Sequence, residues 1–261
     1  MGAVSVTFDN LGEAAELEGG AWPDDRPLGE HFTVVDILPR LLERLDAHGV
    51  SATFFVEAIN AEINPAALDR IRDGGHEVAC HAWRHESWGG LDAQRERELL
   101  ERCRDALGPA GFRPPGGQMT ERTPALLREL GFTYASPAGE RAGVLDGLAL
   151  LPFRWRLIDA YYYLPHFAGL RERHGDPAEP MGPDAMREAA VTAIDGDGEP
   201  HVTLLFHPFL VSMGDEHLEA IDAVLEHVAA REREGALRCV RMEEAAAGVG
   251  GVPVLDPSSW M

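Results

Sequence analysis

Two histidines four residues apart are the first candidates for chemistry in this chain. His81 and His85 stand in the segment HAWRH, and residues at this spacing meet on one side of a helical turn. Imidazole nitrogens bind zinc and other divalent ions. Two ligands make an incomplete metal site, so a third must come from elsewhere in the chain. The alternative is a chance pair, because the chain contains 11 histidines.

Three further segments place polar residues beside apolar runs or rigid turns. Asp9 and Asn10 follow an alternating, β-branched run, where an acid acts either as a base or as a turn former. Arg113 stands in the Pro- and Gly-rich segment GFRPPGG, which presents it from a turn. His207 ends the apolar run 202–206, where a histidine either packs in the core or transfers protons.

The elements that must position these residues alternate along the whole chain, as in an α/β protein. The hydrophobic patterns predict strands at 3–8, 51–56, 76–80, 132–135, 149–153, 201–207 and 237–240. They predict helices at 37–45 with Gly49 as C-cap, at 65–73, 91–107, 184–194 and 216–234, and after the N-cap Thr123, with a polar loop at 11–30. The candidate residues then lie at strand ends, where barrels build their active sites. No linker divides the chain, so we expect one domain over residues 1–261.

Composition excludes several classes of partner. The chain has 23 basic and 44 acidic residues, a net charge of −21, which disfavours nucleic acid and anionic membranes. Every basic residue is arginine, so lysine-based mechanisms are absent. No apolar run is long enough to span a membrane, and no secretory signal is evident. Three scattered cysteines favour reduced thiols, and we expect a cytoplasmic protein.

In their order and spacing, these segments resemble the polysaccharide deacetylase family, also called the NodB-homology or carbohydrate esterase family 4. The family motifs Thr-Phe-Asp-Asp, His-(Ser/Thr)-x-x-His, Arg-x-Pro and Leu-x-His correspond here to TFDN (7–10), HAWRH (81–85), RPPG (113–116) and LFH (205–207), with Trp155 and Asp159 between the last two. The resemblance covers roughly residues 3–247. It implies a single distorted, incompletely closed (β/α) barrel.

The resemblance also implies a hydrolase that removes an acyl group from nitrogen, and it suggests a role for each matching residue. Asp9 matches the base that takes a proton from water, and Arg113 matches the residue that holds this base. His207 matches the acid that protonates the leaving amine, and Asp159 matches the carboxylate that orients and charges this histidine.

A divalent metal is part of the same expectation, with zinc first and cobalt or nickel as alternatives. The resemblance implies that Asn10, His81 and His85 hold it, and that it acidifies a bound water. Asn10 replaces the usual aspartate, however, so affinity should fall and a metal-free site stays open. Ala82 and Gly116 are further departures, replacing the usual Ser or Thr and an aromatic residue, and they should widen the groove.

Three functions are compatible with this pattern. The first is a deacetylase of a small N-acylated metabolite or sugar derivative. The second is a cyclic amide hydrolase, because the segment GHEVACHAWRHESW looks closest to the allantoinase-like, PuuE-type branch. The third is a non-catalytic barrel that binds a small ligand. All three predict a small-molecule partner; a homo-oligomer stays open, and Tyr161, Tyr162 and Tyr163 either wall the substrate or pack a loop.

Overall fold

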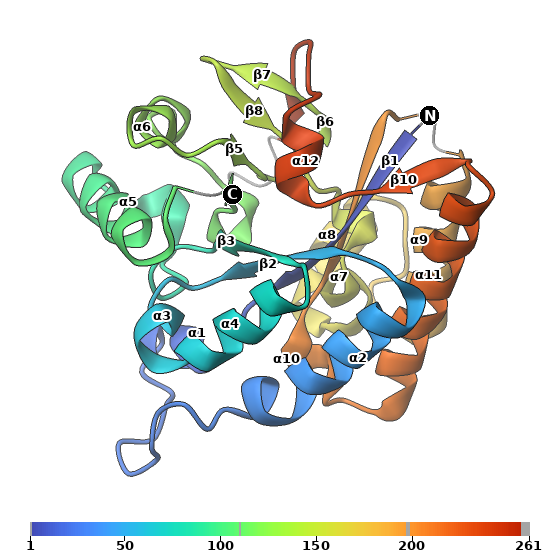
Figure 1. Cartoon of the computed structure of the whole chain (residues 1–261), viewed down its shortest axis with the longest axis horizontal. Helices are drawn as coiled ribbons and strands as arrows, with labels where there is room; N and C mark the ends of the chain where they lie inside the picture. The colour runs from blue at the N-terminus through green and yellow to red at the C-terminus, as the bar shows by residue number, and fades with distance from the viewer. Residues whose placement is uncertain (1, 110, 197–198, 257–261) are drawn as a thin grey trace.

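A curled sheet of nine strands forms the centre of the computed structural model, which describes residues 2–109, 111–196 and 199–256 (Figure 1). The predicted domain 1–261 therefore includes residues 1, 110, 197–198 and 257–261, which lie outside the described part. The strands are β1 (Gly2–Asp9), β2 (Ala52–Val56), β3 (Glu77–Cys80), β4 (Gly111–Phe112), β5 (Tyr134–Ala135), β7 (Gly143–Leu145), β8 (Leu148–Leu150), β9 (His201–Phe206) and β10 (Leu237–Cys239), and a second small sheet pairs β6 (Gly139–Arg141) with β11 (Val254–Leu255).

Strand β1 pairs with three other strands of the large sheet. It pairs along most of its length with β9, and on its other edge first with β10 and then with β2. Strands β2, β3, β4, β5 and β8 continue in order, all parallel, and only β7 runs antiparallel to its neighbour. Two isolated parallel bridges, Ala138–Phe153 and Ile158–Leu205, bring the segment after β8 back to β9. The result is the predicted distorted, incompletely closed barrel.

Alternate side chains of β1 lie in two different environments, one apolar and one partly polar. Val4, Val6 and Phe8 join the main hydrophobic cluster together with residues of the surrounding helices. Successive side chains of a strand point to opposite faces, so Thr7 and Asp9 share the barrel interior. Both are buried, and the Thr7 hydroxyl donates to the backbone oxygen of Leu204 at 2.8 Å. The interior of this barrel is therefore partly polar, and Asp9 stands at its carboxyl end.

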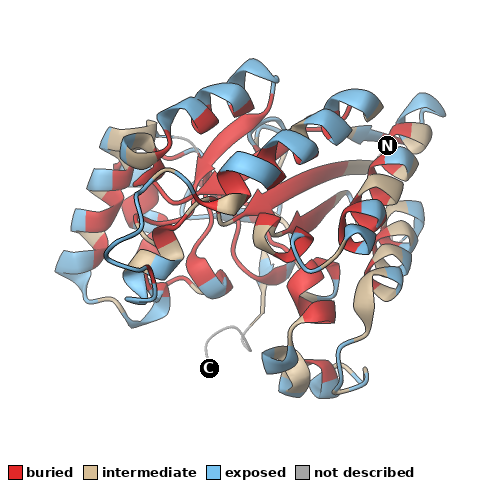
Figure 2. Cartoon of the chain, turned by 90° about the horizontal axis from the view of Figure 1, so that it is seen from below, coloured by how far each residue is buried: buried red, intermediate tan, exposed pale blue. Residues whose placement is uncertain are grey.

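Helices cover the outside of the sheet, with apolar faces buried and outer faces exposed (Figure 2). The helices are α1 (Ala14–Glu18), α2 (Leu38–His48), α3 (Asn60–Ile63), α4 (Pro65–Asp73), α5 (Ala93–Leu107), α6 (Thr123–Glu129), α7 (Asp159–Tyr163), α8 (Ala168–Arg173), α9 (Gly182–Gly196), α10 (Pro208–Val211), α11 (Asp215–Arg233) and α12 (Met242–Ala246). None of the helices in the described ranges is long and apolar enough to cross a membrane. Cys80, Cys103 and Cys239 are free thiols, as predicted.

Each predicted strand and helix agrees with an observed one to within a few residues, but several short elements were not predicted: the helices α1, α3, α7, α8, α10 and α12 and the strands β4, β6, β7 and β11. The predicted loop 11–30 contains the short helix α1, whose five residues are good helix formers but too few to give a helical pattern in the sequence. The segment after Trp155 forms α7 and α8, which the sequence reading left without structure. Thr123 is not an N-cap but the first residue of α6, because its hydroxyl bonds to the buried carboxylate of Glu96 instead of a free helix N–H.

Candidate active site

Residues from four separate segments meet at the carboxyl ends of the strands. Asp9 ends β1, His81 follows β3, Arg113 follows β4 and His207 follows β9. Together with His85 they lie at or near the floor of a cavity of about 350 Å³, which all of them except the fully buried Arg113 line. Parallel strands bring these residues together because their carboxyl ends point to the same edge.

Arg113 holds Asp9 inside the barrel. Its Nη1 donates to Asp9 Oδ1 at 2.6 Å and to the Thr7 hydroxyl at 2.9 Å, while Nε and Nη2 donate to the Ser136 hydroxyl. The guanidinium lies 3.9 Å from the centre of the Phe55 ring. Burial lowers the pKa of Arg113, and the Asp9 carboxylate opposes this effect. Each of the three guanidinium nitrogens of Arg113 donates at least one hydrogen bond, so Arg113 and the Asp9 carboxylate have one fixed orientation.

His81 presents one nitrogen to the same space. Its Nδ1 hydrogen-bonds to the backbone oxygen of Arg113 at 2.8 Å, which assigns the proton to Nδ1 and leaves Nε2 as the acceptor. Nε2 lies 3.9 Å from Asp9 Oδ2. Burial lowers the pKa of His81 to about 3, so the ring is neutral at physiological pH. A neutral imidazole is the form that binds metal ions.

His85 reaches the cavity through an unusual loop and not through the helical turn expected from its spacing. Ala82 and His85 have positive φ angles of 64° and 74°, which fold the chain back. The buried carboxylate of Glu86 accepts hydrogen bonds from two backbone amides of this loop, at Trp83 and Arg84. The rings of His81 and His85 lie 5.0 Å apart. Burial, with a smaller effect of His81, lowers the pKa of His85 to about 3.

His207 and Asp159 form a tight pair, and His207 lines the same cavity. His207 Nδ1 lies 2.6 Å from Asp159 Oδ1, and the backbone amide of His207 donates to Oδ2 at 2.7 Å. Burial lowers the pKa of His207, but the charge and hydrogen bond of Asp159 outweigh burial and raise the pKa above the usual histidine value. The free Nε2 thus belongs to a ring that is readily protonated.

Glu57 is a residue of the site that the sequence reading missed. It follows β2, is buried, and accepts hydrogen bonds from Asn10 Nδ2 at 2.8 Å and from the backbone amide of Leu11. Burial raises the pKa of Glu57 to about 8. These contacts hold Asn10, whose φ of 64° lies in the left-handed region. An acid directly after the apolar strand ATFFV was the available signal, and it repeats the pattern of Asp9.

The candidate metal ligands fit a divalent ion only in part. His81 and His85 are neutral and adjacent, and Asn10 turns its amide nitrogen to Glu57, which leaves its oxygen as a possible ligand. These three side chains carry no negative charge. Among the described residues no group of three or more His, Cys, Asp or Glu side chains is placed to hold a metal ion. The donor set suits weak binding of a divalent ion.

The walls of the cavity are largely apolar. They include Phe153, Trp155, Ile158, Leu164, Phe167, Leu205 and Phe209. At Gly116 an added Cβ would meet nothing within 4 Å, which agrees with the expectation that this departure opens the groove. A polar hollow of about 260 Å³ adjoins there and contains Ser87 and Gln118. Trp83, Trp88 and the three tyrosines Tyr161, Tyr162 and Tyr163 are buried packing residues instead.

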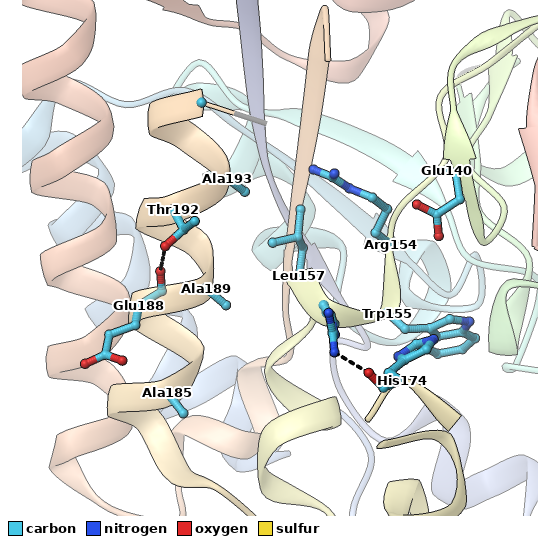
Figure 3. A pocket seen from close by; sticks show the side chains of 12 residues that line it. Glu140, Arg154, Trp155, Leu157, His174, Ala185, Glu188, Ala189, Thr192 and Ala193 are labelled. Atoms are coloured by element: carbon cyan, nitrogen blue, oxygen red, sulfur yellow. Dashed lines mark hydrogen bonds between the residues drawn. The ribbon is translucent and has the colours of Figure 1, made fainter. Parts of the chain in front are cut away.

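A second, larger cavity of about 660 Å³ lies on another side of Trp155 and contains none of the candidate residues (Figure 3). Small residues of α9, including Ala185, Ala189 and Ala193, face Leu157 and Trp155 across it. Neither Asp9 nor His207 lines this space, so the smaller cavity is the one with hydrolytic groups.

Comparison with known proteins shows similarity over the N-terminal half and in the fold. Residues 3–135 match the polysaccharide deacetylase family model. A peptidoglycan deacetylase of Helicobacter pylori is 32% identical over 118 residues, which cover 43% of this chain and 40% of that protein. The matched segment spans only 30% to 40% of the length of the first curated relatives.

Solved structures are similar over almost the whole chain. A candidate polysaccharide deacetylase from Mycobacterium smegmatis has a TM-score of 0.74 and 27% identity, covering 97% of this chain and 93% of its own. PuuE allantoinase has a TM-score of 0.71 at 17% identity, covering 94% of this chain and 89% of its own. The second similarity concerns the fold alone.

Proposed function

Since the chain belongs to the polysaccharide deacetylase family, as the sequence motifs predicted, we propose that it hydrolyses an amide by removing an acyl group from the nitrogen of a small molecule. The observation that carries the proposal is the placement of a fixed carboxylate and a readily protonated imidazole around one cavity. Amide hydrolysis needs both, because water must lose a proton and a poor amine leaving group must gain one.

Asp9 is the base in this proposal. Arg113 occupies Oδ1, so Oδ2 is the oxygen that takes the proton from the attacking water. Arg113 itself is a fully buried positioning residue that fixes the carboxylate without reaching the substrate. The attack forms a tetrahedral intermediate on the acyl carbon, and backbone N–H groups are the donors suited to its oxyanion.

His207 is the acid, and Asp159 is its positioning residue. The Asp159 carboxylate fixes Nδ1 as the proton-bearing partner and keeps the ring protonated to higher pH than a free histidine. Nε2 then gives its proton to the nitrogen as the carbon–nitrogen bond breaks, which releases the amine and leaves the carboxylic acid.

Asn10, His81 and His85 are the residues that would hold a divalent ion, zinc first and cobalt or nickel as alternatives. When bound, such an ion supplies a Lewis acid that polarises the acyl carbonyl and lowers the pKa of water. The neutral donor set also leaves room for a metal-independent reaction by Asp9 and His207. This feature favours the second candidate function, the opening of a cyclic amide of the allantoinase type.

Two assays on the purified protein distinguish these functions. Acetate release from a panel of N-acetylated amines, with and without added zinc, cobalt or nickel, is expected for the acyl hydrolase. Ring opening of cyclic ureides, unaffected by chelators, would favour the alternative. A protein that binds members of either panel but turns over none of them is a ligand-binding barrel, and the proposed hydrolysis would be wrong.

A further inference from the structure

The cavity above Asp9 and His207 presents rings and aliphatic side chains to whatever it binds. Its walls are formed by Phe153, Trp155, Ile158, Leu164, Phe167 and Phe209. The ring centres of Phe153 and Trp155 lie 5.4 Å apart, and those of Trp155 and Phe167 lie 5.8 Å apart. These three rings form a continuous aromatic surface contributed by two segments, one after β8 and one after α7.

This apolar surface lies on the His207 side of the cavity. The Phe209 ring packs against the His207 ring with centres 5.3 Å apart. Ile158, which precedes Asp159, bridges to Leu205 of β9 two residues before His207. Since His207 protonates the leaving nitrogen in the proposed reaction, the group attached to that nitrogen lies against these walls.

Few polar atoms on this side are available to a substrate. Asp159 occupies His207 Nδ1, Glu57 occupies Asn10 Nδ2, and Arg113 occupies Asp9 Oδ1. The polar groups that remain at the floor are Asp9 Oδ2, the Nε2 atoms of His81 and His207, the His85 ring and the Asn10 side-chain oxygen, and each is used by the reaction or would hold the metal ion.

On the walls, two side chains offer a hydrogen-bonding group. The indole Nε1 of Trp155 is buried and has no hydrogen-bond partner among the described residues, and the ring of the exposed His166 stands at the mouth. The polar hollow with Ser87 and Gln118 shares His85 and Gly116 with this cavity, and His207 does not line it. The hydroxyls of a sugar on the leaving nitrogen would find few side-chain partners on these walls, and hydroxyls buried there would lose their hydrogen bonds to water without replacement.

We propose that the leaving group is an apolar amine, aromatic or branched aliphatic, and that the substrate is its N-acyl derivative and not an acetylated sugar. The proposal rests on the function proposed above. Binding of an apolar group in this cavity is driven by the surface that it removes from water.

The first test compares binding of two matched ligands to the wild-type protein by calorimetry. N-acetylbenzylamine and N-acetylglucosamine carry the same acetamide, one on an apolar group and one on a sugar. We expect N-acetylbenzylamine to bind roughly tenfold or more tightly, the preference that a hydrophobic pocket gives to a fitting group. Equal affinity, or tighter binding of the sugar, would overturn the proposal.

A pair of matched variants then locates the preference. Phe167 and Phe32 are both partly buried, pack on the main hydrophobic cluster and lie beside a histidine ring, at 4.5 Å from His166 and 4.4 Å from His31. Only Phe167 lines the cavity. Phe167→Ala should lose most of the preference for the apolar ligand, and Phe32→Ala should keep it. An equal loss in both variants would contradict the assignment of this wall.

Turnover is measured separately, so the two proposals fail in different ways. If the apolar ligand binds preferentially and no acetate is released from any N-acetyl compound, the proposed hydrolysis is wrong and the binding preference stands. If acetate is released from N-acetylglucosamine faster than from N-acetylbenzylamine, the hydrolysis stands and the apolar leaving group is wrong. The wild-type comparison decides the proposal even if Phe167→Ala does not fold.

Discussion

The two ends of the same strands hold buried titratable groups in different ways. At its amino end β3 carries Glu77, whose carboxylate accepts hydrogen bonds from the hydroxyls of Thr53 and Tyr134, each at 2.7 Å, and from the backbone amide of Glu243. At the carboxyl end of β3 stands His81, whose Nε2 faces a cavity shared with Asp9. Residues 77, 79 and 81 lie on one face of the strand, so both ends belong to the barrel interior.

The two ends differ in how many side-chain atoms have a hydrogen-bond partner within the protein. Around Glu77 the protein supplies a hydrogen bond to both carboxylate oxygens, and α12 covers the group. At the other end the protein fixes one atom of each side chain, Asp9 Oδ1 and the Nδ1 atoms of His81 and His207, and leaves the second atom facing the cavity. Buried polar groups satisfied by protein stabilise the fold, whereas half-satisfied ones can bind a ligand.

The largest expected effect is the loss of activity in a variant at the carboxyl end, compared with a variant at the amino end. Asp9→Asn should lower kcat/KM by about 10²–10⁴, the usual cost of removing a general base. Glu77→Gln should leave kcat/KM near the wild-type value and reduce the free energy of unfolding by about 1–3 kcal/mol, because its amide group meets donors where an oxygen is needed. Steady-state kinetics and urea unfolding of both variants check this contrast. A Glu77→Gln variant as inactive as Asp9→Asn would remove the distinction.

Asp9→Asn also has a structural cost that must be measured with its kinetics. The substitution leaves the fully buried Arg113 without its counter-charge. Removing one partner of a buried ion pair typically destabilises a protein by about 3–5 kcal/mol. Circular dichroism and thermal unfolding must therefore show that the variant is folded at the assay temperature before its loss of turnover is assigned to the missing base.

The proposed acid His207, at the carboxyl end of the strands, is tested by how the rate loss of a variant depends on the leaving group. His207→Ala should slow amide hydrolysis by roughly 10²-fold or more, because an amine leaves poorly without a proton. Hydrolysis of an activated ester, whose leaving group needs no proton, should fall far less. The ratio of the two losses is the measurement. Equal losses on both substrates would indicate that His207 binds the substrate or supports the structure and does not act as an acid.

A smaller effect is expected at Asn10, where the site lacks a carboxylate. Asn10→Asp should tighten binding of zinc, cobalt or nickel by roughly tenfold, since a charged ligand joins two neutral imidazoles. Glu57, with a pKa of about 8, is largely protonated at pH 7 and can donate a hydrogen bond to the introduced carboxylate. Isothermal titration calorimetry on wild type and variant measures the change.

The control for this experiment is the double variant Asn10→Asp with Glu57→Gln. In this variant the amide of the glutamine at position 57 donates a hydrogen bond to the introduced carboxylate, and no second acid titrates beside it. We therefore expect the double variant to bind the metal ion more tightly than wild type, as Asn10→Asp does. If no metal binds to wild type or to either variant, and chelators leave activity unchanged, Asn10, His81 and His85 are not a metal site.

The smallest expected effect is a shift in pH dependence. Asp159 raises the pKa of His207 against the opposing effect of burial. Activity that needs the protonated ring is present below this pKa and is lost as the pH rises through it. Asp159→Asn removes the carboxylate that outweighs burial and leaves, besides burial, only the smaller, opposing effects of Asp9 and Arg113, so the falling alkaline limb of kcat/KM should move to lower pH. A pH profile with an unchanged alkaline limb would show that another group titrates there.

The positions of the main strands along the chain and the identity of the polar residues at their ends could be predicted from the sequence, because both depend on local patterns. Alternation in β1 and the apolar runs of β2 and β9 mark strands, and motif order marks Asp9, His81, Arg113 and His207 as candidates. Their roles remain proposals, although the structure brings them around one cavity. The same local reasoning missed α1, because a helix of five residues is too short to show a helical periodicity.

Pairing across the barrel was decided by the tertiary structure alone. Nothing local shows that Glu57 turns to Asn10, that Glu86 holds the His81–His85 loop, or that Phe153, Trp155 and Phe167 form one wall. Each of these contacts joins side chains whose directions depend on strand register and on backbone angles such as the positive φ of Ala82. The sequence by itself determined which groups stand at the carboxyl edge, since strand pattern and motif are local. Which atoms of those groups are occupied and which stay free depends on the packing of distant segments, and this decides the chemistry.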